Sequence, residues 1–261
     1  MFTRKLLELI LVKVIVLLPE SNLVNILRKC LLWIRSDLPL VALARANETV
    51  VHVGCWKIET VCRWSRLVGA KGKVIIIEAI RENVKALEFE AKRRSLNNVI
   101  FINSGVWNSK GEVTMMVHKG TWMKDSDKKK ILDKGQLFLH SRIKDASTYI
   151  DEDTPEYNVN YEEEKIRVDT LDNLLRQVES TEPDHIHLTV TGSEYEVIWG
   201  MENLLRNKAI RIIASSTFLR KDDNRPSHEA VGRLLRQKGL IICLGRRIPG
   251  RHGRYLFAYK K

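Results

Sequence analysis

A glycine and a glutamate each close a short apolar run, at positions where an open α/β sheet binds its ligand. Gly54 ends the run ETVVHVG and Glu78 ends the run KVIIIE, about 24 residues later. A glycine at a strand end lets the backbone approach a ligand, and the helix that follows offers free N–H groups. An acid at the end of the second strand accepts hydrogen bonds from ribose hydroxyls. The layout fits an adenosine; a turn glycine and a surface glutamate are the simpler alternative.

The loop after Gly54 excludes two common nucleotide sites. Cys55, Trp56, Lys57 and Ile58 follow the glycine, so the G-x-G-x-x-G fingerprint of dinucleotide binding is missing. The chain has no P-loop either. An adenosine cofactor without a pyrophosphate points to S-adenosylmethionine rather than NAD.

The order of these pieces resembles a known family. The stretch HVGCWKI, the later KVIIIEA and NNV near the third strand resemble the D-V-G-A-N-x-G, V-x-x-x-E-P and N-V motifs of FkbM-type S-adenosylmethionine-dependent methyltransferases. VDTLDNLL and IHLTVTGSEYEVIWGMENLL are similar to the second half of that family. The resemblance covers about residues 49 to 260 and implies methyl transfer, typically to a hydroxyl of a sugar or another small molecule.

The resemblance also implies which residues contact the cofactor and the reacting atoms. The implied cofactor contacts are His52, Gly54, Cys55, Glu78, Ala79, Asn103 and Ser104. The implied catalytic positions are His187 and Thr189, where the family has lysine and aspartate. A histidine titrates near neutrality and can serve as a base, whereas alternation along a strand also allows His187 to point into a helix layer.

Several polar positions of the family differ here. His52 replaces the first acid and Ile58 the second glycine, while Thr189 and Thr191 replace two acids of the later motif. A threonine cannot replace a carboxylate as a general base. Trp56, in place of the family's asparagine, is expected to crowd the methionine part of the cofactor.

Apolar runs alternate with helical patterns from Thr49 onward, which predicts an α/β fold. We expect a doubly wound, mostly parallel seven-stranded sheet of the class I methyltransferase type, Rossmann-like, preceded by N-terminal amphipathic helices. GEVTMMVH is expected to pair at an edge of that sheet, and KIRVD to form a further strand. Thr170 or Asp169 is expected to cap one later helix, and Ser193 another.

The predicted boundaries divide the chain into an N-terminal helical extension, residues 1–46, and a methyltransferase-like domain, residues 47–261. The domain carries an insertion at about 119–164, where periodicity is lost over a stretch long for a compact domain. In residues 1–35 the apolar stretch is shorter than a membrane span and is interrupted by Glu8 and Lys13. Its two amphipathic helices pack on the domain or contact a membrane surface.

Composition bounds the setting and the partners. Four cysteines without C-x-x-C pairs or zinc spacing predict a reducing, cytoplasmic location, with or without membrane association, and no metal site. A net charge of +12 suits acidic partners. Nucleic acid is disfavoured because the basic runs lack interleaved aromatic residues. The predicted function is O-methylation of a sugar or other small-molecule hydroxyl; the alternative is an inactive relative that binds an acidic partner or a membrane through its basic face.

Overall fold

The computed structural model describes residues 44–118, 141–149, 161–207, 210–247 and 252–260, together with twelve positions between Ile10 and Cys30. The helices are α3 (Ile58–Val68), α4 (Arg81–Arg93), α6 (Leu171–Gln177), α7 (Glu194–Trp199) and α8 (Ser227–Gln237), with a 3₁₀ turn at Leu204–Arg206. The strands of the main sheet are β1 (Thr49–Val53), β2 (Lys73–Glu78), β3 (Val99–Asn103), β9 (His185–Leu188), β10 (Arg211–Ser216), β12 (Leu240–Arg247) and β13 (Arg254–Lys260).

The seven strands have the order β12-β13-β10-β9-β1-β2-β3. β3, β2, β1, β9 and β10 run parallel, and β13 joins β10 and β12 antiparallel. Because the chain first builds from β1 toward β3 and then returns to β9 beside β1, the strand order reverses between β1 and β9. Ligands of open α/β sheets bind beyond the strand ends at such a reversal. The predicted seven-stranded, doubly wound sheet is therefore confirmed.

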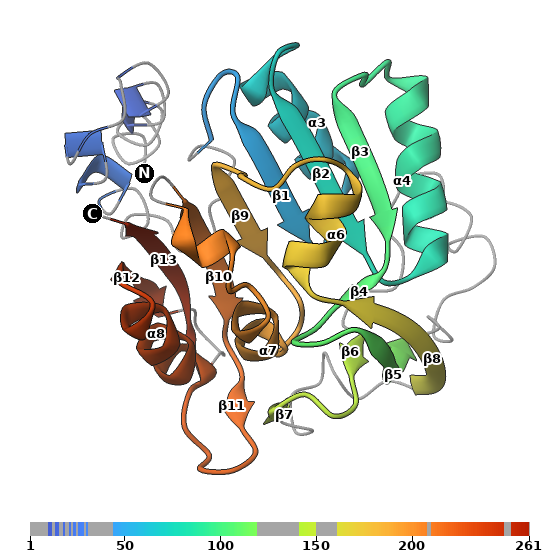
Figure 1. Cartoon of the computed structure of the whole chain (residues 1–261), viewed down its shortest axis with the longest axis vertical. Coiled ribbons are helices and arrows are strands. Elements are labelled where there is room, and N and C mark those ends of the chain that lie inside the picture. The colour runs from blue at the N-terminus through green and yellow to red at the C-terminus, as the bar shows by residue number, and fades with distance from the viewer. Residues whose placement is uncertain are drawn as a thin grey trace, which may run out of the picture.

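Both faces of the sheet are covered (Figure 1). Val51 and Val53 of β1 belong to the core that packs under α6, α7 and α8. Val50 of the same strand belongs to the core shared with α3 and α4. Burial on both faces is typical of parallel strands and explains their nearly continuous apolar runs.

A second sheet of four strands lies beyond the ends of β1 and β2 (Figure 1). It has the order β4-β8-β5-β6, with β4 (Gly105–Val106), β5 (Gly111–His118), β6 (Arg142–Ile143) and β8 (Tyr161–Asp169). The prediction that GEVTMMVH pairs at an edge of the main sheet is wrong, because β5 pairs along its full length with β8. β7 (Thr148–Tyr149) pairs with β11 (Leu219–Arg220) in a separate two-stranded ribbon.

Helix starts agree in part with the predicted caps. Thr170 precedes α6, and its side chain accepts a hydrogen bond from the N–H of Asn173 at 3.2 Å. Ser193 precedes α7 as predicted, but its hydroxyl donates to the carbonyl of Val190 instead of accepting from the helix. Ser193 thus holds the turn before the helix closed.

The predicted N-terminal helices fall mostly outside the described residues. Leu11, Ile15 and Val24 are described and pack against Ile213 and Phe257 of the main sheet. The predicted insertion is also described only in part, and its described residues supply β6, β7 and the start of β8. Within the described part of the chain, no helix is long and apolar enough to cross a bilayer.

Candidate functional site

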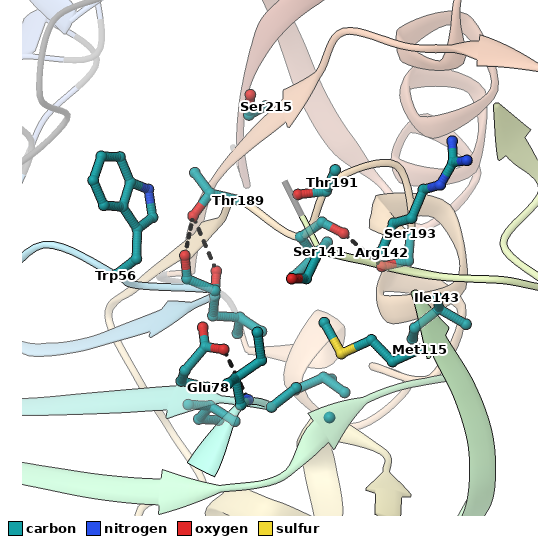
Figure 2. Close-up of a pocket in the computed structure, with 18 of the residues that line it drawn as sticks. Trp56, Glu78, Met115, Ser141, Arg142, Ile143, Thr189, Thr191, Ser193 and Ser215 are labelled. Atoms are coloured by element: carbon teal, nitrogen blue, oxygen red, sulfur yellow. Dashed lines mark hydrogen bonds between the residues drawn. The ribbon is translucent and has the colours of Figure 1, made fainter. Parts of the chain in front are cut away.

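A cavity of about 390 Å³ opens where the strand order reverses, at the carboxyl ends of β1, β2 and β9 (Figure 2). The second sheet forms its opposite wall through Met115 and Ile143. The volume is in the range of small-molecule sites in proteins. The cavity is therefore the candidate binding site for a cofactor and a second substrate.

Glu78 is the buried acid of this cavity. It ends β2 with 7% of its surface exposed, and its Oε1 accepts from the N–H of Ile80 at 2.9 Å and from Nδ2 of Asn83 at 3.4 Å. Burial raises the pKa of Glu78 to about 7, although these hydrogen bonds lower it. A carboxyl group can accept more hydrogen bonds than these two, so Glu78 is suited to receive further hydroxyl donors from a ligand.

Asn83 is a site residue that the sequence analysis missed. It lies in the first turn of α4 and lines the cavity. Its Oδ1 is buried and has no hydrogen-bond partner among the described residues. Glu78 and Asn83 both line the cavity, and their side chains carry acceptor oxygens of the kind that bind ribose hydroxyls and the amino group of an adenosine. The signal in the sequence that could have identified Asn83 was its position five residues after Glu78, at the start of a helix.

Five predicted positions line the cavity and four do not. Gly54, Glu78, Ala79, Ser104 and Thr189 line it. His52, Cys55, Asn103 and His187 are not among the lining residues.

Asn103 and Cys55 support the site from outside. Nδ2 of Asn103 donates to the carbonyls of Glu78 and Ala79 at 3.1 and 3.0 Å, and so fixes the end of β2. Cys55 is buried with its thiol against the carbonyl of Lys57, and burial raises its pKa to about 12. A thiol with so high a pKa is not a nucleophile at neutral pH.

His187 lies on the α3 side of the sheet, behind the strand ends. Its ring centroid is 4.2 Å from that of His52 and 6.1 Å from that of Trp64. Burial lowers the pKa of His187 to about 3, so its imidazole is neutral at physiological pH. The structure places this predicted base away from the cavity, because the even-numbered residues of β1 and the odd-numbered residues of β9 face α3.

Thr189 lies at the cavity edge directly after β9 (Figure 2). Its hydroxyl donates to the carbonyls of Gly54 and Val53 at 3.0 and 3.2 Å. Gly54 adopts φ +79°, and a Cβ there would lie 2.3 Å from the carbonyl oxygen of Thr189. Glycine is required because the backbones of β1 and β9 approach each other this closely.

Trp56 and Ile58 have different positions. Trp56 lines one border of the cavity, with the ammonium group of Lys57 4.0 Å from the centroid of its ring. Ile58 starts α3 and is fully buried in the core beneath that helix, so it does not enter the cavity. Of these two residues, Trp56 alone lines the cavity and limits the space for a ligand.

Hydroxyl side chains gather on the wall away from Glu78. They are Ser141, Thr191, Ser193, Ser215 and Thr217. Sequence reasoning missed most of this wall, because it is assembled from the loop before β6, the turn after β9 and the end of β10. Among the described lining residues there is no imidazole, and Glu78 and Arg142 are the charged ones. The described residues also contain no group of three or more His, Cys, Asp or Glu side chains able to hold a metal ion.

A protein-family model identifies the family of this chain. The family model of the methyltransferase FkbM domain matches residues 46–242. A methyltransferase FkbM from Methylobacillus flagellatus KT aligns with TM-score 0.53 and 14% identity, over 98% of this chain and 59% of that one. The chain therefore spans less than two thirds of that protein, and the likeness at this identity shows a shared fold.

Two further solved structures are more distant. Aeropyrum pernix fibrillarin, in complex with natively bound S-adenosyl-L-methionine, aligns with TM-score 0.49 and 11% identity, over 89% of this chain and 73% of that one. The O-methyltransferase from Bacillus cereus, in complex with SAH, aligns with TM-score 0.44 and 10% identity, over all of this chain and 91% of that one. No curated protein matches the sequence.

Proposed function

Because the chain belongs to the FkbM methyltransferase family, we propose that it transfers a methyl group from S-adenosylmethionine to a hydroxyl of a sugar or another small molecule. The observation that carries this proposal is the cavity at the β1–β9 reversal, with the buried carboxyl group of Glu78 at its β2 end. The inactive alternative has no support from the family match.

The residues present fit the cofactor. Glu78 and Asn83 would hold the ribose and adenine through their acceptor oxygens, and Ala79 and Ser104 would border the same part of the cavity. The Gly54 turn would lie along the rest of the molecule. When bound, the cofactor supplies an electrophilic methyl group on a sulfonium.

The remaining wall would bind the methyl acceptor. Hydroxyl side chains of this wall can form hydrogen bonds to a sugar, apart from the proton of Ser193, which is donated to Val190. Met115 and Ile143 offer an apolar surface for the ring. Among the described lining residues there is no histidine to act as a base, and in this proposal positioning supplies most of the rate. Holding two reactants in line contributes up to about 7–11 kcal/mol in favourable cases.

Binding of the cofactor is the first expected result. Titration calorimetry of the purified chain is expected to detect both S-adenosylmethionine and S-adenosylhomocysteine, with ATP and NAD as negative controls because the Gly54 loop lacks a phosphate fingerprint. A folded protein, checked by circular dichroism, that binds neither ligand would contradict the proposal. Transfer of a labelled methyl group to a panel of sugars and non-sugar alcohols then tests the methyl acceptor.

We also propose that the segment within residues 1–35 contacts a membrane surface. Ile10, Leu23 and Ile26 expose 49%, 57% and 52% of their surfaces, while Leu11 and Val24 of the same segment pack on the main sheet. A segment that is apolar on both sides has surface left to bury in a lipid interface. The net charge of +12 favours anionic lipids.

Substituting Leu23 and Ile26 by glutamine is expected to weaken binding to phosphatidylserine vesicles, measured by cosedimentation, roughly fivefold. Two aliphatic side chains are then no longer transferred from water into the lipid interface. The matched control is Phe89→Gln, which removes an exposed apolar side chain on α4. Equal sedimentation of the double variant and the wild type would exclude this contact.

A further inference from the structure

His52 takes part in a directional chain of hydrogen bonds behind the cavity. The indole N–H of Trp64 donates to its Nδ1 at 3.2 Å, and its Nε2 lies 3.0 Å from the hydroxyl of Thr189. An indole nitrogen is a donor only. Nδ1 of His52 must therefore be unprotonated, which places the single proton of the neutral ring on Nε2. The Nε2–H consequently donates to the oxygen of Thr189.

The hydrogen bond from His52 to Thr189 fixes the direction of the bonds that the Thr189 hydroxyl makes. With its oxygen accepting from His52, the Thr189 hydroxyl uses its own proton to donate to the carbonyls of Gly54 and Val53. Both residues and Thr189 line the cavity, whereas His52 and Trp64 do not. The chain thus runs from the core beneath α3 to the turn where β1 and β9 approach each other.

The surroundings of His52 keep its ring neutral. The side chain is 4% exposed, and burial, then the neighbouring His187, lowers its pKa well below the ordinary value. A protonated ring could not accept from Trp64, so the neutral form is the one compatible with both bonds. His52 therefore brings no charge to the strand end, and its contribution is geometric.

We propose that His52 is a positioning residue: its imidazole, fixed between Trp64 and Thr189, holds the Gly54 turn in the geometry that admits the cofactor. The inference deepens the proposed function and rests on it.

The experiment pairs two substitutions at the same position. In His52→Phe the ring volume is kept and both hydrogen bonds are lost. In His52→Gln the amide still donates toward Thr189. We expect His52→Phe to weaken binding of S-adenosylmethionine roughly five- to tenfold by calorimetry and His52→Gln to recover most of that loss. His185→Phe is the matched control: it replaces another buried imidazole that touches Trp64 and makes no hydrogen bond among the described residues.

A second readout does not depend on the cofactor. Nitrogen-15 NMR of the histidine side chains is expected to show an Nε2–H tautomer for His52, with an unprotonated Nδ1, throughout pH 6–8. An Nδ1–H tautomer, or wild-type affinity in His52→Phe, overturns the inference while leaving the proposed function standing. Failure of the wild type itself to bind S-adenosylmethionine refutes the proposed function, and with it the positioning role, even when NMR finds the relay. Where His52→Phe does not fold, Thr189→Val breaks the same relay, and wild-type affinity in that variant overturns the inference.

Discussion

Replacing Glu78 by alanine is expected to weaken the binding of S-adenosylmethionine by about 1.5–3 kcal/mol, roughly 10- to 150-fold in Kd. The carboxyl group lines the cavity at the end of β2, where its Oε1 accepts from the N–H of Ile80 and from Nδ2 of Asn83. Burial keeps water from the Glu78 carboxyl group, and ribose hydroxyls would donate hydrogen bonds to it instead. Calorimetry measures the change, with Glu82→Ala, an exposed acid in the first turn of α4, as the control.

The same interaction predicts a proton linkage. Burial raises the pKa of Glu78 to about 7 in the free protein, and hydroxyl donors would favour the ionised form and lower that pKa. Binding should therefore release protons near pH 7 and tighten as pH rises from 6 to 8. Calorimetry in buffers with different ionisation enthalpies detects the release. Unchanged affinity in Glu78→Ala would refute the ribose assignment.

Replacing Glu194 by glutamine is expected to stabilise the protein at alkaline pH. Glu194 is 1% exposed, its Oε2 is buried without a hydrogen-bond partner among the described residues, and burial raises its pKa to about 8, with Glu196 adding to the effect. Its Oε1 accepts from the N–H of Gly192, a bond that glutamine can keep. The substitution removes the ionisable group without changing its shape.

The sign follows from proton binding. Between an unfolded pKa near 4.5 and a folded pKa of about 8, the folded state holds a proton that the unfolded state has lost, so stability falls as pH rises through this window. At about 1.4 kcal/mol per unit of pKa, the loss is on the order of 3–5 kcal/mol above pH 8. Glu78 adds a smaller total loss in the same direction, because its window ends at about pH 7.

Urea unfolding at pH 5 and pH 8.5 measures the difference. The free energies of unfolding of wild type and Glu194→Gln should nearly coincide at pH 5 and separate by a few kcal/mol at pH 8.5, with the variant more stable. The control is Glu202→Gln, an exposed carboxylate. A constant difference between Glu194→Gln and wild type at both pH values would show that Glu194 does not titrate as described.

Glu194 also bears on the cavity. The turn before it places Thr191 at φ +48° and Gly192 at φ +94°, and the hydroxyl of Thr148 donates to the carbonyl of Gly192 at 2.6 Å. A neutral buried carboxyl group beneath this turn avoids an unpaired charge next to the cavity wall. The stability cost of Glu194 at high pH therefore arises at a turn that borders the cavity.

The amino-acid sequence alone determined the sheet and the two strand-end residues. Gly54 and Glu78 end apolar runs, and the alternation of strands and helices makes those runs parallel neighbours whose carboxyl ends meet at one edge. Both residues line the cavity as expected. These features follow from local pattern and chain order, which is why they needed no knowledge of the folded chain.

Only the tertiary structure decided which way the strand residues point and which sheet the later strands join. Both faces of β1 and β9 are buried, so apolar pattern cannot tell which residues face α3; the register of β1 against β9 puts His52 opposite His187 on that side. Likewise, each residue of β5 pairs with a residue of β8 that lies 43 or more positions later in the chain. Met115 of β5 lines the cavity wall that the second sheet forms. Such pairings depend on long-range packing. They place His187, the predicted catalytic histidine, in the core beside His52.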